Sequence, residues 1–267
     1  MFPLQKNHIR VLVLDTETTG FLPKHRRGDA FPPSEAYPYI TQLSWVLYNV
    51  ERNMIDDTFD AYIRIPDEIP VTEEITKITG ITKDLLNRRG QPIVPALMAL
   101  YRAYMKSSVI IAHNMHFDSQ VIRQEIYRNK DALFKATGSE EHVANMRGLF
   151  THNFNKVNEI EQFCTMMKTI EFCGIDFAPK PVTNPLMLLA NVALEDAGIV
   201  VDPKTSSRKK FPTLSELYKK LFEKDAPANM HNSIIDVFVC LRCFLKLTGC
   251  HEISDANFDL LVKVSQL

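Results

Sequence analysis

The sequence lacks the features of a secreted, membrane-spanning or disulfide-stabilised protein. No segment approaches the run of about 20 apolar residues that a membrane span needs, and the apolar run at 11–14 is too short for an export signal. The five cysteines are an odd number without framework spacing, which is typical of a reducing compartment. We therefore expect a soluble intracellular protein, cytoplasmic or nuclear, with no membrane partner.

A strong charge of either sign is also missing. The chain has 31 lysines and arginines against 32 aspartates and glutamates, a net charge of −1. This balance argues against a protein that holds nucleic acid by attraction over its whole surface. It leaves open an enzyme that grips a strand end through local basic clusters. No G-x-x-x-x-G-K-[ST] segment occurs, which excludes a P-loop nucleotide switch.

Two cysteines three positions apart, Cys240 and Cys243, suggest a zinc site, with Cys250 and His251 as further ligands. Both lie in the strongly apolar helical run 237–245. Thiols on such a helix usually pack as small hydrophobic groups, and structural zinc sites normally show two clear ligand pairs. The pattern therefore favours core packing over zinc.

The order of the expected elements predicts an α/β fold with a mixed sheet. A short apolar strand ends at Asp15, and two long segments, at 40–50 and 54–65, have the pattern of an antiparallel hairpin. Two shorter strands are expected at 109–112 and around 163–165. Helices are expected at 72–80, 95–106, 117–128, from 213 onward and at about 229–247, with a weaker one near the C-terminus.

The domain organisation predicted by the pattern is a single domain over residues 1–250. A probable insertion lies at about 171–211, where the pattern is loose and four prolines occur, with some helix expected at 185–196. Residues 251–267 are expected to form a C-terminal helical tail.

The first candidate site is the pair Asp15 and Glu17 at the end of the first strand. Alternate residues of a strand project from the same face, so these two carboxylates are expected to lie together. Like charges this close repel unless a cation lies between them, and an oxygen-only ligand set suits Mg²⁺ or Mn²⁺. Taken alone, the pair is also explained by a solvated acidic turn.

Two further elements carry candidate groups. Asp118 is expected in the first turn of the helix after the strand at 109–112, and His231 precedes Asp236 by five residues. Histidine is the usual general base near neutral pH. Each element alone has a structural explanation, since an acid in a first helical turn is favoured by the macrodipole.

Taken together, the three elements resemble the motifs of one enzyme family. They are D-x-E-T-T-G at 15–20, H-N-x-x-F-D at 113–118 and H-x-x-x-x-D at 231–236. In this order they resemble the DEDDh 3′–5′ exonucleases, the family of the proofreading epsilon subunit of bacterial DNA polymerase III, RNase T and oligoribonuclease. Asn232, where a sister subclass has tyrosine, puts the chain on the histidine side. The span between Asp118 and His231 is longer than in compact members.

The resemblance implies a ribonuclease H-like mixed five-stranded sheet flanked by helices, and a two-metal site. By the family's pattern, Asp15, Glu17, Asp118 and Asp236 hold two Mg²⁺ ions, for which Mn²⁺ can substitute, and His231 is the general base. The implied substrate-binding residues are Thr18, Thr19, Gly20, Phe21, Gly80, Ile81, Asn114 and Phe117. Basic clusters at 24–27, 88–89 and 208–210 either contact phosphates or are solvated surface.

The implied function is a 3′–5′ exonuclease that releases nucleoside 5′-monophosphates from single-stranded 3′ ends, with DNA as the expected substrate. A proofreading or DNA repair role, with a polymerase or repair complex as partner, would suit this activity. The alternatives are an exoribonuclease of the RNase T or oligoribonuclease kind, a different metal hydrolase, and a non-catalytic nucleic-acid-binding protein of the same fold.

Overall fold

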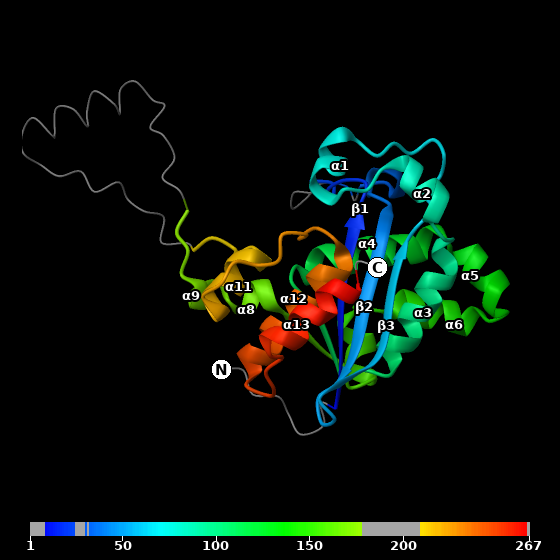
Figure 1. Cartoon of the computed structure of the whole chain (residues 1–267). Helices are drawn as coiled ribbons and strands as arrows, with labels where there is room; N and C mark the ends of the chain where they lie inside the picture. Colours follow the sequence, from blue (N-terminus) through cyan, green and yellow to red (C-terminus); the bar gives the residue numbers. More distant parts are fainter. Residues whose placement is uncertain (1–8, 25–29, 31, 178–208, 266–267) are drawn as a thin grey trace, which may run out of the picture.

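The computed structural model describes residues 9–24, 30, 32–177 and 209–265. Its centre is a five-stranded sheet in the order β3-β2-β1-β4-β5 (Figure 1). The strands are β1 (Arg10–Thr18), β2 (Ile40–Asn49), β3 (Met54–Tyr62), β4 (Val109–Ala112) and β5 (Glu161–Cys164). The neighbouring pairs β1–β2 and β2–β3 are antiparallel, whereas β1–β4 and β4–β5 are parallel. The predicted α/β fold with a mixed sheet is confirmed.

Helices cover both faces of this sheet and the end at which β1 terminates. They are η1 (Ser34–Ala36), α1 (Glu73–Thr79), α2 (Lys83–Arg89), α3 (Ile93–Met105), α4 (Met115–Arg128), α5 (Lys130–Thr137), α6 (Glu140–Gly148), α7 (His152–Val157), α8 (Thr165–Lys168), α9 (Ile170–Cys173), α11 (Leu214–Phe222), α12 (Ser233–Thr248) and α13 (Asp255–Val264). Within the described ranges no helix is long and apolar enough to cross a membrane.

Strand β1 separates two hydrophobic layers because its side chains alternate between the faces of the sheet. Leu12 and Leu14 are buried in the layer built by α3 and α4. Val11 and Val13 are buried in the opposite layer, against α12. The strand continues to Thr18, past the predicted end, so both acidic residues of the first motif lie within the ladder with β2.

Local capping signals define several helix ends as the sequence predicts. The Thr72 hydroxyl accepts a hydrogen bond from the Ile75 N–H at the start of α1, and Gly80 ends that helix with φ of 72°. Thr213 and Glu216 form the reciprocal capping box at the start of α11. Helix α1 therefore ends at the turn that the family resemblance singles out.

The cysteines of the C-terminal helix pack inside the protein. Cys240 and Cys243 of α12 are 2% and 0% exposed and belong to the same apolar cluster as Phe258 of α13. Burial raises the pKa of both thiols, so they stay protonated at neutral pH. The packing interpretation of this pair is confirmed.

The expected insertion lies mostly outside the described residues, at 178–208, as does the helix expected at 185–196. Its two described ends meet. Asp176 and Lys209 form an isolated antiparallel bridge, and the Lys210 N–H donates to the Ile175 carbonyl at 2.8 Å. The chain therefore leaves and re-enters the domain at neighbouring points. Residues 25–27 and 208 of the basic clusters also fall outside the described ranges.

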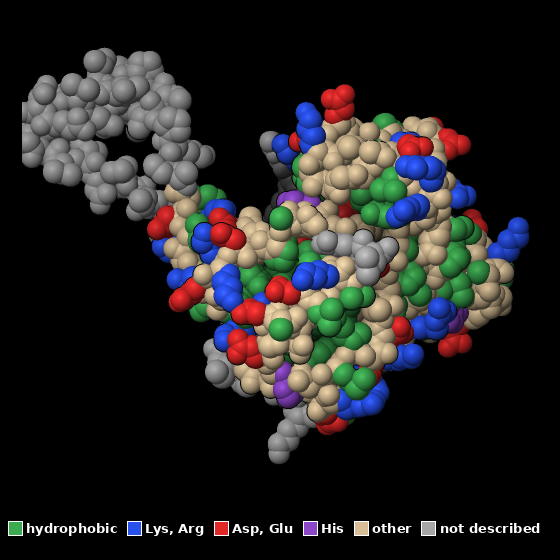
Figure 2. All heavy atoms as spheres, in the orientation of Figure 1, with side chains coloured by type: hydrophobic (Ala, Val, Ile, Leu, Met, Phe, Trp, Pro, Cys, Tyr) green, Lys and Arg blue, Asp and Glu red, His purple; other side chains and the backbone are tan. Residues whose placement is uncertain are grey.

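Charges of both signs are mixed over the face that carries α11, α12 and α13 (Figure 2). Several exposed pairs lie here, such as Lys246 with Glu252, whose charged atoms are 2.8 Å apart. This interspersion matches the near-zero net charge of the chain. The face that Figure 2 shows has no basic field of the kind that holds a long nucleic acid.

Candidate active site

Two carboxylates of the site project from β1 toward α12. Asp15 and Glu17 are two residues apart in the strand, so their side chains share the face opposite to Leu14. The Ser233 hydroxyl, in the first turn of α12, donates to the Asp15 carbonyl oxygen at 2.7 Å. This bond fixes the start of α12 directly beside the first motif.

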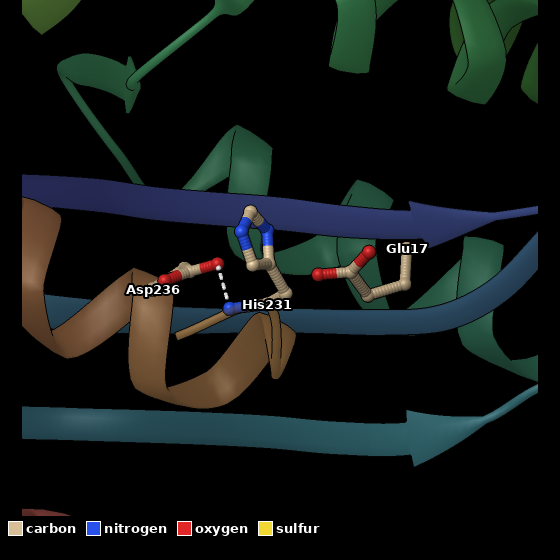
Figure 3. A group of neighbouring side chains, drawn as sticks. All are labelled: Glu17, His231 and Asp236. Atoms are coloured by element: carbon tan, nitrogen blue, oxygen red, sulfur yellow. Dashed lines mark hydrogen bonds between the residues drawn. The ribbon is translucent and has the colours of Figure 1, made fainter. Parts of the chain in front are cut away.

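The third motif faces Glu17 from the start of α12. Ligand atoms of Glu17, His231 and Asp236 all lie within 4.8 Å of one another. Figure 3 shows the imidazole of His231 beside both carboxylate groups. Asp236 is buried, whereas His231 is exposed. A solvent-accessible imidazole therefore lies next to two acids.

The pattern predicts that His231 lies within the helix, but in the structure it lies two residues before the helix begins. Helix α12 begins at Ser233, and His231 has a left-handed backbone with φ of 67°. Such a conformation is uncommon for a residue with a side chain. Its N–H donates to the Asp236 carboxylate at 3.1 Å, so the acid holds the backbone that carries the imidazole.

Gln42 of β2 fixes the residues between His231 and the helix. Its side-chain N–H donates to Asn232 Oδ1 at 3.1 Å, and its Oε1 accepts from the Ser233 N–H at 3.3 Å. The side chain of Gln42 is buried. The second strand therefore contributes to the site through the position of the third motif.

Asp118 enters the site from the opposite layer. It lies in the first turn of α4, as predicted, and is 3% exposed. The Thr16 hydroxyl donates to its Oδ1 at 2.8 Å. Because Thr16 lies between Asp15 and Glu17 but faces the other side of the sheet, the strand holds acids from both layers at one end.

The electrostatics of the four carboxylates are unfavourable without a cation. Burial, followed by repulsion from Asp15, Asp236 and Asp118, raises the pKa of Glu17. Burial raises the pKa of Asp15, Asp118 and Asp236 as well. In the described part of the chain no lysine or arginine forms an ion pair with any of these four acids.

Two buried oxygens of this cluster have no hydrogen-bond partner among the described residues. They are Oδ2 of Asp15 and Oδ1 of Asp236. Buried polar atoms are rarely left without a partner, and a cluster of acids without a counter-charge is strongly unfavourable. The donor set consists of hard carboxylate oxygens, which fits a divalent cation.

The residues after the first motif form an open turn. The Thr18 hydroxyl donates to the Gly20 carbonyl at 2.6 Å, and Thr19 is paired to the backbone of Tyr39 through both its N–H and its hydroxyl. Apart from its chain neighbours, no described residue has an atom within 4 Å of a Cβ placed on Gly20, and Phe21 is 70% exposed. This turn is therefore open to a ligand beside the acids.

The other predicted substrate-binding residues differ in accessibility. Gly80 borders open space, and Asn114, immediately before α4, is exposed. Phe117 is partly buried against the α3–α4 layer. Ile81 is 1% exposed and packs in a small cluster with Leu86, and its backbone bonds to the Thr79 and Thr76 hydroxyls.

His113 of the second motif has a structural role in this geometry. Its Nε2 is 2.9 Å from the Pro212 carbonyl oxygen, which can only accept, so this nitrogen carries a proton. Burial lowers the pKa of His113 to about 4. The ring is therefore neutral at pH 7, and Nδ1 accepts from the Thr165 hydroxyl at 2.9 Å. His113 thus joins β4 to α8 and to the loop before α11.

The lowered pKa of His113 predicts a loss of stability in acid. The unfolded chain takes up this proton near the usual pKa of about 6.5, so the stabilisation is complete above that pH and is lost as pH falls toward 4. In wild type this proton uptake should lower the free energy of unfolding by up to about 3 kcal/mol as the pH falls from about 6.5 to 4. We expect His113→Gln to lack this part of the pH dependence. Urea unfolding at several pH values checks this, and the same pH dependence in both proteins would contradict it.

An arginine of α4 holds the segment that supports the open turn. Arg128 donates to the carbonyls of Ser34, Tyr37 and Pro38 and pairs with the buried Glu125 at 3.1 Å. Its guanidinium also lies 3.9 Å from the centre of the Tyr39 ring. Since Tyr39 pairs with Thr19, the contacts of Arg128 extend to the first motif.

Sequence reasoning missed the positioning residues Thr16, Ser233, Glu125 and Arg128. Thr16 had a signal, because strand alternation places it opposite the two acids and toward α4. Arg128 had none, since its partners lie about 90 residues away in the sequence. Asn232 marked the subclass, but its contact with Gln42 depends on the fold.

The fold and the acidic site define a class, the DEDD-type 3′–5′ exonucleases of the ribonuclease H-like superfamily, which are metal-dependent enzymes. Residues 12–170, more than half of the chain, match the RNase T family, described as exonuclease. The protein belongs to this exonuclease family.

Relatives and solved structures agree with this assignment. The chain is 24% identical over 250 residues to DNA polymerase III subunit epsilon of Buchnera aphidicola subsp. Schizaphis graminum, covering 92% of this chain and 77% of that protein. It is 35% identical over 107 residues to the PolC-type DNA polymerase III of Halalkalibacterium halodurans, covering 40% of this chain but only 6% of the polymerase. E. coli exonuclease I in complex with a dA16 oligonucleotide has the same fold, with a TM-score of 0.54, 17% identity, 96% coverage of this chain and 43% of that one.

Proposed function

We propose that the protein removes nucleotides one at a time from the 3′ end of single-stranded DNA and releases nucleoside 5′-monophosphates. The observation that carries this proposal is the convergence of Asp15, Glu17, Asp118 and Asp236 with the exposed His231 at the carboxyl end of β1. The open turn at 18–21 follows directly on Glu17, and a Cβ at Gly20 would meet no described atom within 4 Å.

The four carboxylates would hold two Mg²⁺ ions, with Mn²⁺ as a substitute. When bound, such ions stabilise the negative charge that develops on the oxygens of the phosphodiester during displacement. The unpartnered oxygens of Asp15 and Asp236 support this assignment. Thr16 holds Asp118 in place, and Ser233 fixes the backbone of Asp15, so the ligands are positioned from both layers.

His231 would act as the general base that takes a proton from the attacking water. Its exposure allows it to pass this proton to solvent, and its position beside Glu17 and Asp236 places it at the acids. The Asp236 carboxylate holds the His231 backbone, so one residue serves both the acidic cluster and the base. The leaving 3′ oxygen belongs to the shortened strand.

At the strand end, Thr18, Thr19, Gly20 and Phe21 would contact the last nucleotide, with Gly80, Ile81, Asn114 and Phe117 around it. Gly20 leaves room for close approach. The exposed ring of Phe21 is suited to stacking on a nucleotide base. Such stacking does not depend on sequence, because every base has a flat aromatic face. We also propose that residues 1–250 act as one catalytic unit, with the segment at about 171–211 as an insertion and 251–267 as a tail.

Two comparisons support DNA rather than RNA as the substrate. The epsilon subunit and the PolC-type enzymes are parts of DNA polymerases, and exonuclease I was solved with DNA oligonucleotides. The relation to the epsilon subunit also supports association with a polymerase.

Matched 5′-labelled strands of DNA and RNA with the same sequence test the substrate assignment. We expect both polymers to be shortened from a free 3′ end, and neither to be shortened when the 3′ terminus is blocked. We also expect a higher kcat/KM for DNA. A higher kcat/KM for RNA would replace the proposed substrate by the exoribonuclease alternative. Binding of either strand without any shortening would favour the non-catalytic alternative.

A further inference from the structure

A groove of about 700 Å³ lies on the outer side of α4, away from the acidic cluster. It is lined by Tyr37, Gln120, Arg123, Gln124, Tyr127, Ala144, Arg147 and Gly148. These residues include two arginines and two glutamines but no acid. The lining of this groove is therefore positively charged, although the chain as a whole has a net charge of −1.

The two arginines of the groove are available to a ligand. Arg123 on α4 and Arg147 on α6 are exposed, and neither forms an ion pair with any described residue. Some other exposed cations are paired; Lys219, for example, pairs with Asp225 at 2.8 Å. Free guanidinium groups on facing helices suit phosphates, which they bind with two donors each.

The groove is connected to the active-site side of the protein through Tyr37, which lies two residues before Tyr39, the backbone partner of Thr19 in the open turn. On α4, Gln120, Arg123, Gln124 and Tyr127 have the spacing of one helix face. The exposed His116 precedes Gln120 by four residues, so this face starts in the same helical turn as Asp118. From His116 to Tyr127 the helix rises by about 16 Å. This face of α4 therefore carries polar side chains from the first turn of the helix onward.

One wall of the groove is fixed to α4 by several contacts. Gln124 donates to the Ser34 hydroxyl, and Arg128 donates to the Tyr37 carbonyl. Tyr37 is therefore held at the groove by the helix that forms its floor. At the far end Tyr127 is 51% exposed, and the Lys130 ammonium lies 5.8 Å from the centre of its ring. The groove thus combines cations with accessible aromatic rings, as single-strand sites do.

We propose that this α4–α6 groove binds the sugar–phosphate backbone of the substrate strand upstream of the 3′-terminal nucleotides. Arg123 and Arg147 contact phosphates, and Tyr37 and Tyr127 offer faces for bases. The groove thereby gives the enzyme affinity for long strands that its neutral overall charge does not supply. This inference rests on the proposed exonuclease function for its direction, but its binding step is testable without cleavage.

The test compares wild type with Arg123→Ala/Arg147→Ala. In EDTA, we expect the double variant to bind a labelled strand of about 20 nucleotides about tenfold more weakly, measured by fluorescence anisotropy. The slope of log affinity against log salt should fall by about 1.4, the value for two phosphate contacts on a single strand. In Mg²⁺, KM for the long strand should rise by a similar factor, whereas kcat/KM for a dinucleotide should not change.

Two further proteins act as controls. Arg102→Ala/Lys106→Ala removes two exposed cations at the other end of the sheet, near the start of β4, and should bind like wild type. Arg123→Lys/Arg147→Lys keeps the charge and should recover the salt slope. Unchanged strand affinity and KM in the alanine variant would contradict the proposed binding groove. An equal loss of kcat/KM on the dinucleotide would contradict it as well. Failure of wild type to shorten any strand would overturn the proposed function instead, while anisotropy would still decide the groove.

Discussion

Replacing Asp15 with asparagine should lower kcat by about three orders of magnitude or more, because metal-ion stabilisation supplies several kcal/mol at the transition state. Asp15 lies at the centre of the cluster, since its charge raises the pKa of Glu17, Asp118 and Asp236. The change keeps the shape of the side chain and leaves the Ser233 bond to the Asp15 carbonyl intact. Single-turnover cleavage of a labelled DNA strand measures the effect.

The same substitution should not destabilise the protein, which distinguishes a catalytic role of Asp15 from a structural one. Its carboxylate has a pKa raised by burial, so ionisation costs folding free energy as pH rises through that value. In EDTA at about pH 8 the asparagine variant should therefore melt at the same or a higher temperature than wild type. Asp57→Asn, which alters an exposed acid of β3, should change neither kcat nor melting temperature. Near-normal cleavage by Asp15→Asn would remove this residue from the catalytic set.

His231→Asn should lower kcat by about 10²–10⁴-fold, the usual contribution of a general base. Asparagine is chosen because it tolerates the left-handed backbone better than most residues, and His231 has φ of 67°. The bond from the residue 231 N–H to Asp236 is a backbone bond and persists in the variant. Loss of activity can then be assigned to the imidazole rather than to a displaced loop.

Metal affinity separates the roles of His231 and the acids. The His231→Asn variant should bind Mn²⁺ nearly as well as wild type, measured by calorimetry, whereas the Asp15→Asn variant should bind it much more weakly. A His231→Asn protein with kcat within a few-fold of wild type would contradict the general-base assignment. Equal loss of Mn²⁺ affinity in both variants would instead make His231 a metal ligand.

Several parts of the fold and site follow from local sequence. The alternation of Val11–Leu14 defines a strand buried on both faces, and Thr72, Gly80 and the Thr213–Glu216 pair define helix ends through backbone hydrogen bonds. Alternation also places Asp15 and Glu17 on one face. These predictions succeed because the interactions that decide them lie within a few residues of one another.

Other parts depend on contacts between distant segments. The start of α12 is held by Gln42, about 190 residues earlier in the chain, which bonds to Asn232 and to the Ser233 N–H beside the left-handed His231. Helical propensity alone extends that helix past His231. Helices α5, α6 and α7 likewise escape prediction, because they are short and only a few of their residues are buried. The resemblance to a family located the acids, but the residues that hold them required the structure.

The most direct test of the central claim is a time course of a 5′-labelled single-stranded DNA with wild-type protein, in Mg²⁺ and in EDTA. The geometry predicts a ladder of bands that shortens from the 3′ end in Mg²⁺, nucleoside 5′-monophosphates as the released product, and no shortening in EDTA. An intact strand in both Mg²⁺ and Mn²⁺, or a ladder that is unaffected by EDTA, would contradict the assignment of the four carboxylates to a metal-dependent exonuclease site.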